Sequence, residues 1–471
     1  MAANYLHGVE TIEITSGSRP VQVVKSSVIA LVGTAPLGPK NEPTLVLSTS
    51  DAAQFGQSLP GFTIPQAIDA ILKQGPATII VVNTFNETTN TANVTAESKT
   101  ITNGKLKLNF APIGAVSIFL TDGTTAFSGV KDVDYTLDAF GNFTALTAVA
   151  AEALLLKFTY KKLNTGTVTS AQIIGTNVSN VRTGTKCFEL IFNTFGFTPK
   201  ILIAPVYVEN VAVATELIAI APKYRAIALI DAPAGTSVSA AIAGRGPAST
   251  INLKTSSDRA YLLCPHLKAY DADSDSNIDV PYSQFMAGVI AKTDLNEGYW
   301  VSPSNREILG IVGTEYIVTA SVNDANTDAN LLNEKGITTT FTGYGTGTRT
   351  WGNRSASFPT STDPKNFIPI RRMADIVHES LEQAMLQFID KPINQATIDA
   401  IRDTGNGFFR TLIGRGACLP GSKVVYNTEL NTPEELAAGH VYFDLNFMGP
   451  TPAERITFQS FIDINLLTSI V

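Results

Sequence analysis

A multidomain α/β and α+β fold is predicted for this chain: a parallel or mixed-sheet α/β core, an inserted antiparallel β domain, a C-terminal helix-plus-strand domain, and extended arms at both termini. Three observations predict it. The length of 471 residues suggests about three domains at roughly 150 residues each. Two short apolar runs, 28–33 and 78–82, flank a helical pattern at 65–73, as in a βαβ unit with buried parallel strands. Short alternating segments separated by turn residues follow at about 103–195, which is typical of an antiparallel β domain.

These patterns divide the chain into five parts. They are an N-terminal arm at 1–22, a middle α/β domain at 23–88 plus 196–365, an inserted β-rich domain at 89–195, an α+β domain at 366–449 and a C-terminal arm at 450–471.

The middle domain is expected to continue with alternating strands and helices after residue 200. The expected strands are 201–208, 225–231 and 261–265, and the expected helices are 211–222 and 282–292. Residues 298–365 are rich in Gly, Thr and Asn, and are expected to form loops and irregular strands.

In the insert, residues 86–102 are dominated by Thr, Asn and Ala, and are expected to be a linker. The strands expected after it are 105–110, 116–120, 154–160 and 188–192.

The C-terminal domain begins with the clearest helical pattern in the chain. From Arg372 to Ile389, apolar positions advance by steps of three and four. Asn394 is a plausible N-cap for a second helix. The period then becomes two, which predicts strands at 424–426 and 441–447.

Both ends of the chain are strand-like without a partner in the neighbouring sequence. Val9, Ile12 and Ile14 precede a flexible break at Ser16, Gly17 and Ser18, which is a candidate hinge. At the other end, Ile456, Phe458, Ile462 and Ile464 fall on one face of an extended tail. An unpartnered strand exposes N–H and C=O groups that another chain can satisfy. Alternatively, the arms pack back on their own domain, since terminal strands in a chain's own sheet are common.

Composition excludes several classes of function. The formal net charge is −7, from 34 basic and 41 acidic residues, so the basic surplus of a general nucleic-acid binder is missing. No apolar run reaches the ~18–20 residues that cross a bilayer, and the N-terminus does not resemble a secretory signal. We therefore expect a protein made and folded in a cytosol, without direct nucleic-acid binding or membrane insertion.

No pattern of catalytic or metal-binding residues is found. Cys187, Cys264 and Cys418 are expected to be buried reduced thiols. The spacing of the histidines along the sequence does not match that of a metal-binding motif. The four histidines are His7, His266, His378 and His440.

Two loops resemble ligand-binding motifs only in part. Residues 33–40 follow a strand, but Pro39 removes an N–H that a phosphate loop needs, and Asn41 replaces the metal-binding hydroxyl. The alternating Asp271, Asp273 and Asp275 lack the Gly and Glu of an EF-hand and are expected to form a solvated loop. We expect no enzyme activity, no cofactor and no metal.

Several spans that carry no chemistry are similar, in order, to contractile tail sheath proteins of the P2-like phage and R-type tailocin kind. The matching spans are 5–10, 19–21, 28–36, 298–305, 308–310, 332–337, 351–354, 371–375, 431–436, 439–442 and 450–456. Ser355 stands where this pattern has Thr, and the insert carries no signature of the family.

The resemblance implies a structural subunit that polymerises helically as stacked, hexameric rings around an inner tube and contracts to drive the tube through a cell envelope. It implies an inner tail tube protein, a baseplate and a tail terminator as partners, assembly in a bacterial host cytoplasm, and a place in a virion tail or tailocin particle. It also implies that neighbours exchange terminal strands. The residues expected in this exchange are Val9, Ile12, Ile14, Val441, Phe443, Ile456, Phe458, Ile462 and Ile464. In that family the α+β domain lies innermost and the insert outermost. A tube or surface-layer subunit is the alternative, and a doubly wound enzyme is ranked last.

Overall fold

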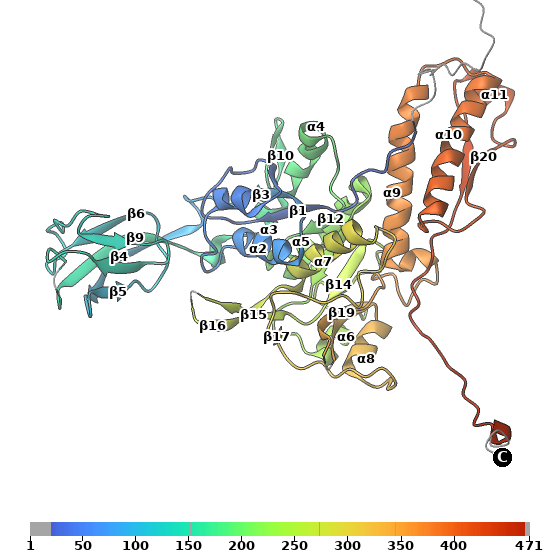
Figure 1. The fold of residues 1–471 in the computed structure, drawn as a ribbon. Helices are drawn as coiled ribbons and strands as arrows, with labels where there is room; N and C mark the ends of the chain where they lie inside the picture. Colours follow the sequence, from blue (N-terminus) through green and yellow to red (C-terminus); the bar gives the residue numbers. More distant parts are fainter. Residues whose placement is uncertain (1–19, 151, 273, 344, 467–471) are drawn as a thin grey trace, which may run out of the picture.

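The computed structural model describes residues 20–150, 152–272, 274–343 and 345–466 (Figure 1). Figure 1 shows a small β-rich lobe at one end, a central sheet covered by helices, and a pair of long helices at the other end, from which the C-terminal tail leaves. The mixed α/β class expected from the sequence is confirmed.

The core is an eight-stranded mixed sheet with the order β19-β18-β14-β13-β12-β1-β3-β2. Its six inner strands are parallel, and the edge strands β19 and β2 are antiparallel to their neighbours. The strands are β1 (Val28–Gly33), β2 (Thr44–Val46), β3 (Thr78–Asn83), β12 (Ile201–Ile203), β13 (Ile227–Asp231), β14 (Ala260–Leu263), β18 (Ile337–Gly343) and β19 (Gly347–Trp351). The expected βαβ unit is present, because α2 connects the parallel strands β1 and β3.

Helices cover both faces of this sheet. On β1, Ile29 and Leu31 pack with α2 and α7, while Val28, Ala30 and Val32 pack with helices of the opposite face. The first face is covered by α2 (Ile64–Gln74) and α7 (Tyr282–Asn296), and the second by α3 (Ser170–Ile174), α5 (Val211–Tyr224), α6 (Val238–Gly244) and α8 (Asp328–Glu334). Burial on both faces explains why these strands read as continuous apolar runs.

The lobe consists of two three-stranded antiparallel sheets, with the orders β4-β9-β6 and β5-β8-β7. The strands are β4 (Thr91–Thr100), β5 (Lys105–Lys107), β6 (Ile113–Phe119), β7 (Tyr135–Leu137), β8 (Asn142–Ala145) and β9 (Leu155–Leu163). Within the second sheet, Tyr135 of β7 stacks on Phe143 of β8 with ring centroids 4.7 Å apart, and Phe143 meets Phe158 of β9 in the first sheet edge-on at 6.2 Å. The prediction of a linker at 86–102 is wrong, because β4 occupies most of this segment. β4 has no fully buried residue, so it carries little of the apolar alternation that reveals a strand.

Three other expectations are corrected. The expected strand 188–192 is instead the end of a 3-10 helix, η3 (Gly184–Leu190), followed by α4 (Ile191–Phe195). Its buried residues Cys187, Phe188 and Ile191 have helical spacing and pack on the central sheet. The expected strand 201–208 stops at Ile203, because Pro205 lacks a ladder donor and the chain turns into η4 (Tyr207–Glu209). Residues 298–365 are more regular than expected, since they supply α8 and both strands at one end of the sheet.

The remaining short elements lie around the sheet. They are α1 (Thr49–Ala52), η1 (Ala53–Phe55), η2 (Thr165–Thr167), a hairpin of β10 (Asn177–Val178) and β11 (Val181–Arg182), a small sheet of β15 (Leu267–Asp271), β16 (Ser276–Val280) and β17 (Gly313–Thr314), and η5 (Pro364–Asn366).

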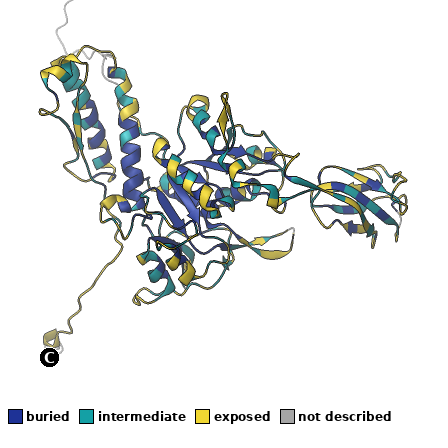
Figure 2. Cartoon of the chain, turned by 180° about the vertical axis from the view of Figure 1, so that it is seen from behind, coloured by how far each residue is buried: buried dark blue, intermediate teal, exposed yellow. Residues whose placement is uncertain are grey.

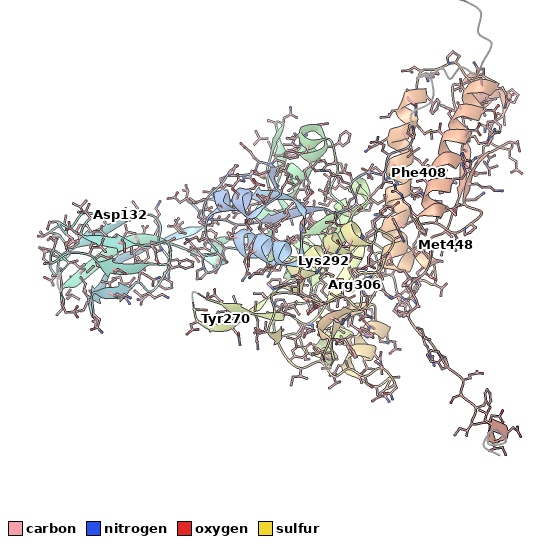
Figure 3. The ribbon with its side chains drawn as sticks, in the orientation of Figure 1. Asp132, Tyr270, Lys292, Arg306, Phe408 and Met448 are labelled. Carbon is pink, nitrogen blue, oxygen red and sulfur yellow. The ribbon has the colours of Figure 1, made fainter. Side chains whose placement is uncertain are left out.

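The C-terminal domain packs two long helices against a two-stranded sheet. Its elements are α9 (Ile368–Met385), η6 (Leu386–Phe388), α10 (Gln395–Gly414), β20 (Lys423–Tyr426), α11 (Pro433–Ala437) and β21 (Phe443–Asn446). Figure 3 shows Phe408 between the two helices, and its side chain belongs to their shared core. The predicted cap is confirmed, because the Asn394 side chain accepts a hydrogen bond from the Thr397 N–H at 2.9 Å.

Candidate functional site

The described cysteine and histidine side chains that could take part in chemistry are dispersed over the structure, and each is buried or contacts another group of the chain. Burial raises the pKa of each of the three thiols, Cys187, Cys264 and Cys418, to about 11, so they stay protonated near neutral pH. Burial lowers the pKa of His378, and His440 contacts Glu435 on the surface at 2.8 Å. His7 lies outside the described residues.

The described polar groups of the two partial motifs form hydrogen bonds within the chain. In 33–40, the Asn83 side chain hydrogen-bonds the backbone of Ala35 and Leu37, and Lys40 donates to the Ala35 carbonyl at 3.1 Å. In the acidic loop, Asp271 accepts from Ser274 and Asp275 accepts from Tyr270, while Asp273 lies outside the described residues. Within the part of the chain that the structure describes, no group of three or more His, Cys, Asp or Glu residues could hold a metal ion, and no helix is both long and apolar enough to cross a membrane.

One buried acidic cluster at the end of β13 was not predicted. Asp231 accepts hydrogen bonds from the Ser283 N–H and hydroxyl at the start of α7, and burial raises the pKa of Asp231 to about 6. Nearby, His266 Nε2 lies 3.1 Å from the Ala232 carbonyl and 3.4 Å from Glu209. Because these groups bind one another and the N-terminus of α7, the cluster holds elements together. Its members are far apart in sequence and match no motif.

Charged side chains of α9 are buried against the ends of the central strands. Arg259 forms two hydrogen bonds to the Asp375 carboxylate, at 2.7 and 2.8 Å. Lys200 pairs with Glu379, and burial lowers the pKa of Lys200. These ion pairs join the C-terminal domain to the central sheet, and removal of one partner would leave a buried charge that has lost a compensating partner.

The two-stranded sheet of the C-terminal domain has one covered edge and one open edge. Asn427 N–H donates to the Tyr442 carbonyl, so by antiparallel alternation the backbone groups of Val424 point away from β21. The Asn406 side chain binds both of them, at 2.8 and 3.2 Å. On β21, the same alternation points the backbone of Phe443 and Leu445 outward, and β21 pairs only with β20 within the described chain.

The tail that follows β21 makes few contacts with its own chain. Every residue from 453 to 466 is exposed, and no helix or strand is assigned from 447 to 463 (Figure 2). The exposed fractions of the predicted apolar residues are 70% for Ile456, 90% for Phe458, 98% for Ile462 and 74% for Ile464. The view that this arm packs back on its own body therefore does not describe this conformation of the chain.

The other predicted site residues fall into two groups. Val441 and Phe443 are half-buried at the start of the open strand β21. Val9, Ile12 and Ile14 and the hinge residues Ser16, Gly17 and Ser18 lie outside the described residues. The segment that follows them does reach the C-terminal domain, where Val21, Val23 and Val24 pack against its core.

Two protein-family models match consecutive parts of the chain. The model of the phage tail sheath protein central domain matches residues 180–356, and that of the phage tail sheath C-terminal domain matches residues 360–463. The chain is 44% identical to the tail sheath protein of Burkholderia phage BcepMu, over 100% of this chain and 99% of that protein. The chain belongs to the phage tail sheath family.

Two further likenesses span the whole sheath protein. The tail sheath protein of Escherichia phage P2 is 26% identical over 100% of this chain and 98% of its own length. The helical sheath of the anti-feeding prophage in its contracted state shares the fold, with a TM-score of 0.62 and 16% identity over 98% of this chain and 100% of that chain. The chain is a structural subunit of a contractile tail sheath and a virion tail component, not an enzyme.

Proposed function

We propose that this sheath subunit polymerises around an inner tube and links its neighbours by exchanging terminal strands, so that the polymer contracts without coming apart. The proposal is based on two features that occur together on the same chain: β21 has an open strand edge, and the tail is exposed with apolar residues at alternate positions. Each copy thus offers both halves of an intermolecular β-sheet.

The open edge of β21 is the proposed acceptor. The backbone groups of Val424 on β20 are already bound by Asn406, whereas those of Phe443 and Leu445 point outward. An incoming strand would satisfy the outward groups without displacing any side chain. The N-terminal arm, with Val9, Ile12 and Ile14, is proposed to contribute a further strand beside the first.

The magnitudes fit a link that survives contraction. About six interchain hydrogen bonds at a net ~0.5–1.5 kcal/mol each would contribute ~3–9 kcal/mol. Each apolar anchor such as Phe458 would add ~1.5–3 kcal/mol on full burial. Ordering of the tail and loss of translational freedom offset part of this sum.

The relatives support a proposal for the wider assembly. Sheath subunits form a helical oligomer, and the solved relatives include a sheath and a baseplate of the anti-feeding prophage. We extend this to stacked hexameric rings, an inner tube protein, a baseplate and a tail terminator as partners, with assembly in the cytoplasm of a bacterial host. The acidic balance of the chain supports a role without direct nucleic-acid contact.

Deletion of residues 456–471 tests the proposal. Electron microscopy and sedimentation should show a folded, soluble subunit that no longer polymerises. Phe458→Asp should weaken polymerisation strongly, whereas the matched charge at the adjacent position, Gln459→Asp, should have a smaller effect because that side chain lies on the opposite face of the strand. Polymers of normal length from the deletion variant would overturn the proposal.

A further inference from the structure

The root of the C-terminal tail is held at one point by an ion pair. Glu454 accepts hydrogen bonds from the guanidinium of Arg354, including Nε at 3.1 and 3.2 Å from its two carboxylate oxygens. The two residues are one hundred positions apart in sequence. Arg354 lies just after β19, so the contact ties the tail to the central domain and not to the domain from which it comes.

Arg354 is itself fixed by its surroundings. Its guanidinium carbon lies 3.6 Å from the ring centroid of Phe367 and 4.6 Å from that of Phe358. Its NH1 donates to the Asn366 side chain at 2.6 Å. Phe367 is the residue that precedes α9, so the anchor sits at the junction of the central sheet and the long helix. A planar guanidinium stacked on aromatic rings presents a carboxylate site of fixed direction, which a lysine would not reproduce.

The segment between Gly449 and Glu454 is attached to the body at both of its ends, and the exposed tail follows it. Gly449 is buried so closely that a Cβ there would lie 2.6 Å from Met373 Cε. The carbonyl of the preceding residue, Met448 (labelled in Figure 3), accepts a hydrogen bond from the Leu419 N–H. Glu454 is the second point of attachment. Beyond it, residues 455–466 are exposed.

We propose that Arg354 is a positioning residue for assembly: it holds Glu454 so that the tail leaves the body in one direction. This inference rests on the proposed strand exchange. A tail anchored only at Gly449 would search a larger volume, because five more residues would move, and the effective concentration of its strand near the neighbour's open edge would fall. Preorganisation of this kind raises the rate and yield of association without a new contact.

Folding alone does not account for the pair. Glu454 is an exposed residue, and exposed ion pairs contribute little to stability. The pair fixes the start of a segment whose following residues, 455–466, are exposed. The sequence offers a matched control, because Arg306 also binds a carboxylate with two nitrogens, that of Glu297 at the end of α7.

The test measures the direction of the tail and assembly separately. Spin labels at Ser460→Cys and Ser239→Cys, both at exposed positions, report the distance between tail and body, since the three native cysteines are buried. In dispersed full-length subunits, Glu454→Gln and Arg354→Lys should widen this distance distribution about twofold, while Glu297→Gln and Arg306→Lys should leave it unchanged. The rate of polymer formation, followed by light scattering, should fall on the order of tenfold only in the first pair.

Each outcome has a separate meaning. An unchanged distance distribution in Glu454→Gln would overturn the anchor. A wider distribution with a normal rate of polymerisation would overturn its role in assembly. Failure of the proposed function would show differently, as normal polymers from the deletion of residues 456–471.

Discussion

The central sheet and the C-terminal tail use their apolar residues in opposite ways. In the sheet, both faces are covered by helices of the same chain, and even the outer edge of β19 is hydrogen-bonded by the loop at 305–308. In the C-terminal domain, the outer edge of β21 has no neighbouring strand among the described residues, and the tail exposes Phe458 and Ile462 almost completely. The same residue types are therefore buried in the subunit's own core in one region and exposed in the second.

This contrast predicts that substitutions in the body change the stability of the single subunit, while substitutions in the tail change assembly alone. Stability refers here to the free energy of unfolding of dispersed subunits, measured by urea titration at low protein concentration, because polymerisation would itself stabilise the fold.

The largest effect is expected where α9 meets the sheet. Arg259→Leu leaves Asp375 buried beside a single remaining partner, Arg371, and should lower the free energy of unfolding by ~3–5 kcal/mol. A loss below ~1 kcal/mol would mean that this junction is not an essential part of the body.

The next effect depends on pH and belongs to the centre of the sheet. Burial raises the pKa of Asp231 from 3.8 to about 6, so the folded state binds its proton more tightly than the unfolded state. The resulting stabilisation is present below pH 4 and is lost as the pH rises through about 6. Relative to Asp231→Asn, the wild-type chain should gain ~2 kcal/mol between pH 7 and pH 4. A difference between the two proteins that stays constant over this range would contradict the assignment.

A smaller effect is expected at the start of α10. Asn394→Ala removes the side-chain cap on the Thr397 N–H and should cost ~0.5–2 kcal/mol. Asn394→Asp retains the accepting oxygen and should cost much less. Equal losses from both variants would show that the cap does not stabilise the helix.

The smallest effect on the single subunit is expected in the tail. Phe458→Ala should change the free energy of unfolding by less than ~0.5 kcal/mol, because the residue is 90% exposed in the subunit. The same variant should polymerise less well than the wild type. A clear loss of subunit stability would show that the tail packs on its own body in solution.

The sequence predicts the elements whose apolar residues face one chain's own core. The strands β1 and β3 are buried on both faces and therefore appear as continuous apolar runs. The helices α2 and α9 bury apolar residues spaced by three and four positions and therefore show a helical period. β4 is missed because it is polar and half-exposed, and α4 is misread because a short apolar run fits either strand or helix.

The features of the candidate site also fall into those that the local sequence predicts and those that it does not. The alternation of apolar and polar residues in the tail can be recognised in a short stretch of sequence, and it predicts an extended strand there. Contacts between distant residues carry no local signal, and so Asp231 with Ser283, Asn406 with Val424, and Arg354 with Glu454 emerge only from the fold.

A cryo-electron microscopy map of the assembled wild-type sheath tests the central claim most directly. We predict that the main chain of residues 456–464 of one copy is hydrogen-bonded to β21 (Phe443–Asn446) of another copy. A map in which each tail lies on its own subunit, with no main-chain pairing between copies, would contradict the account.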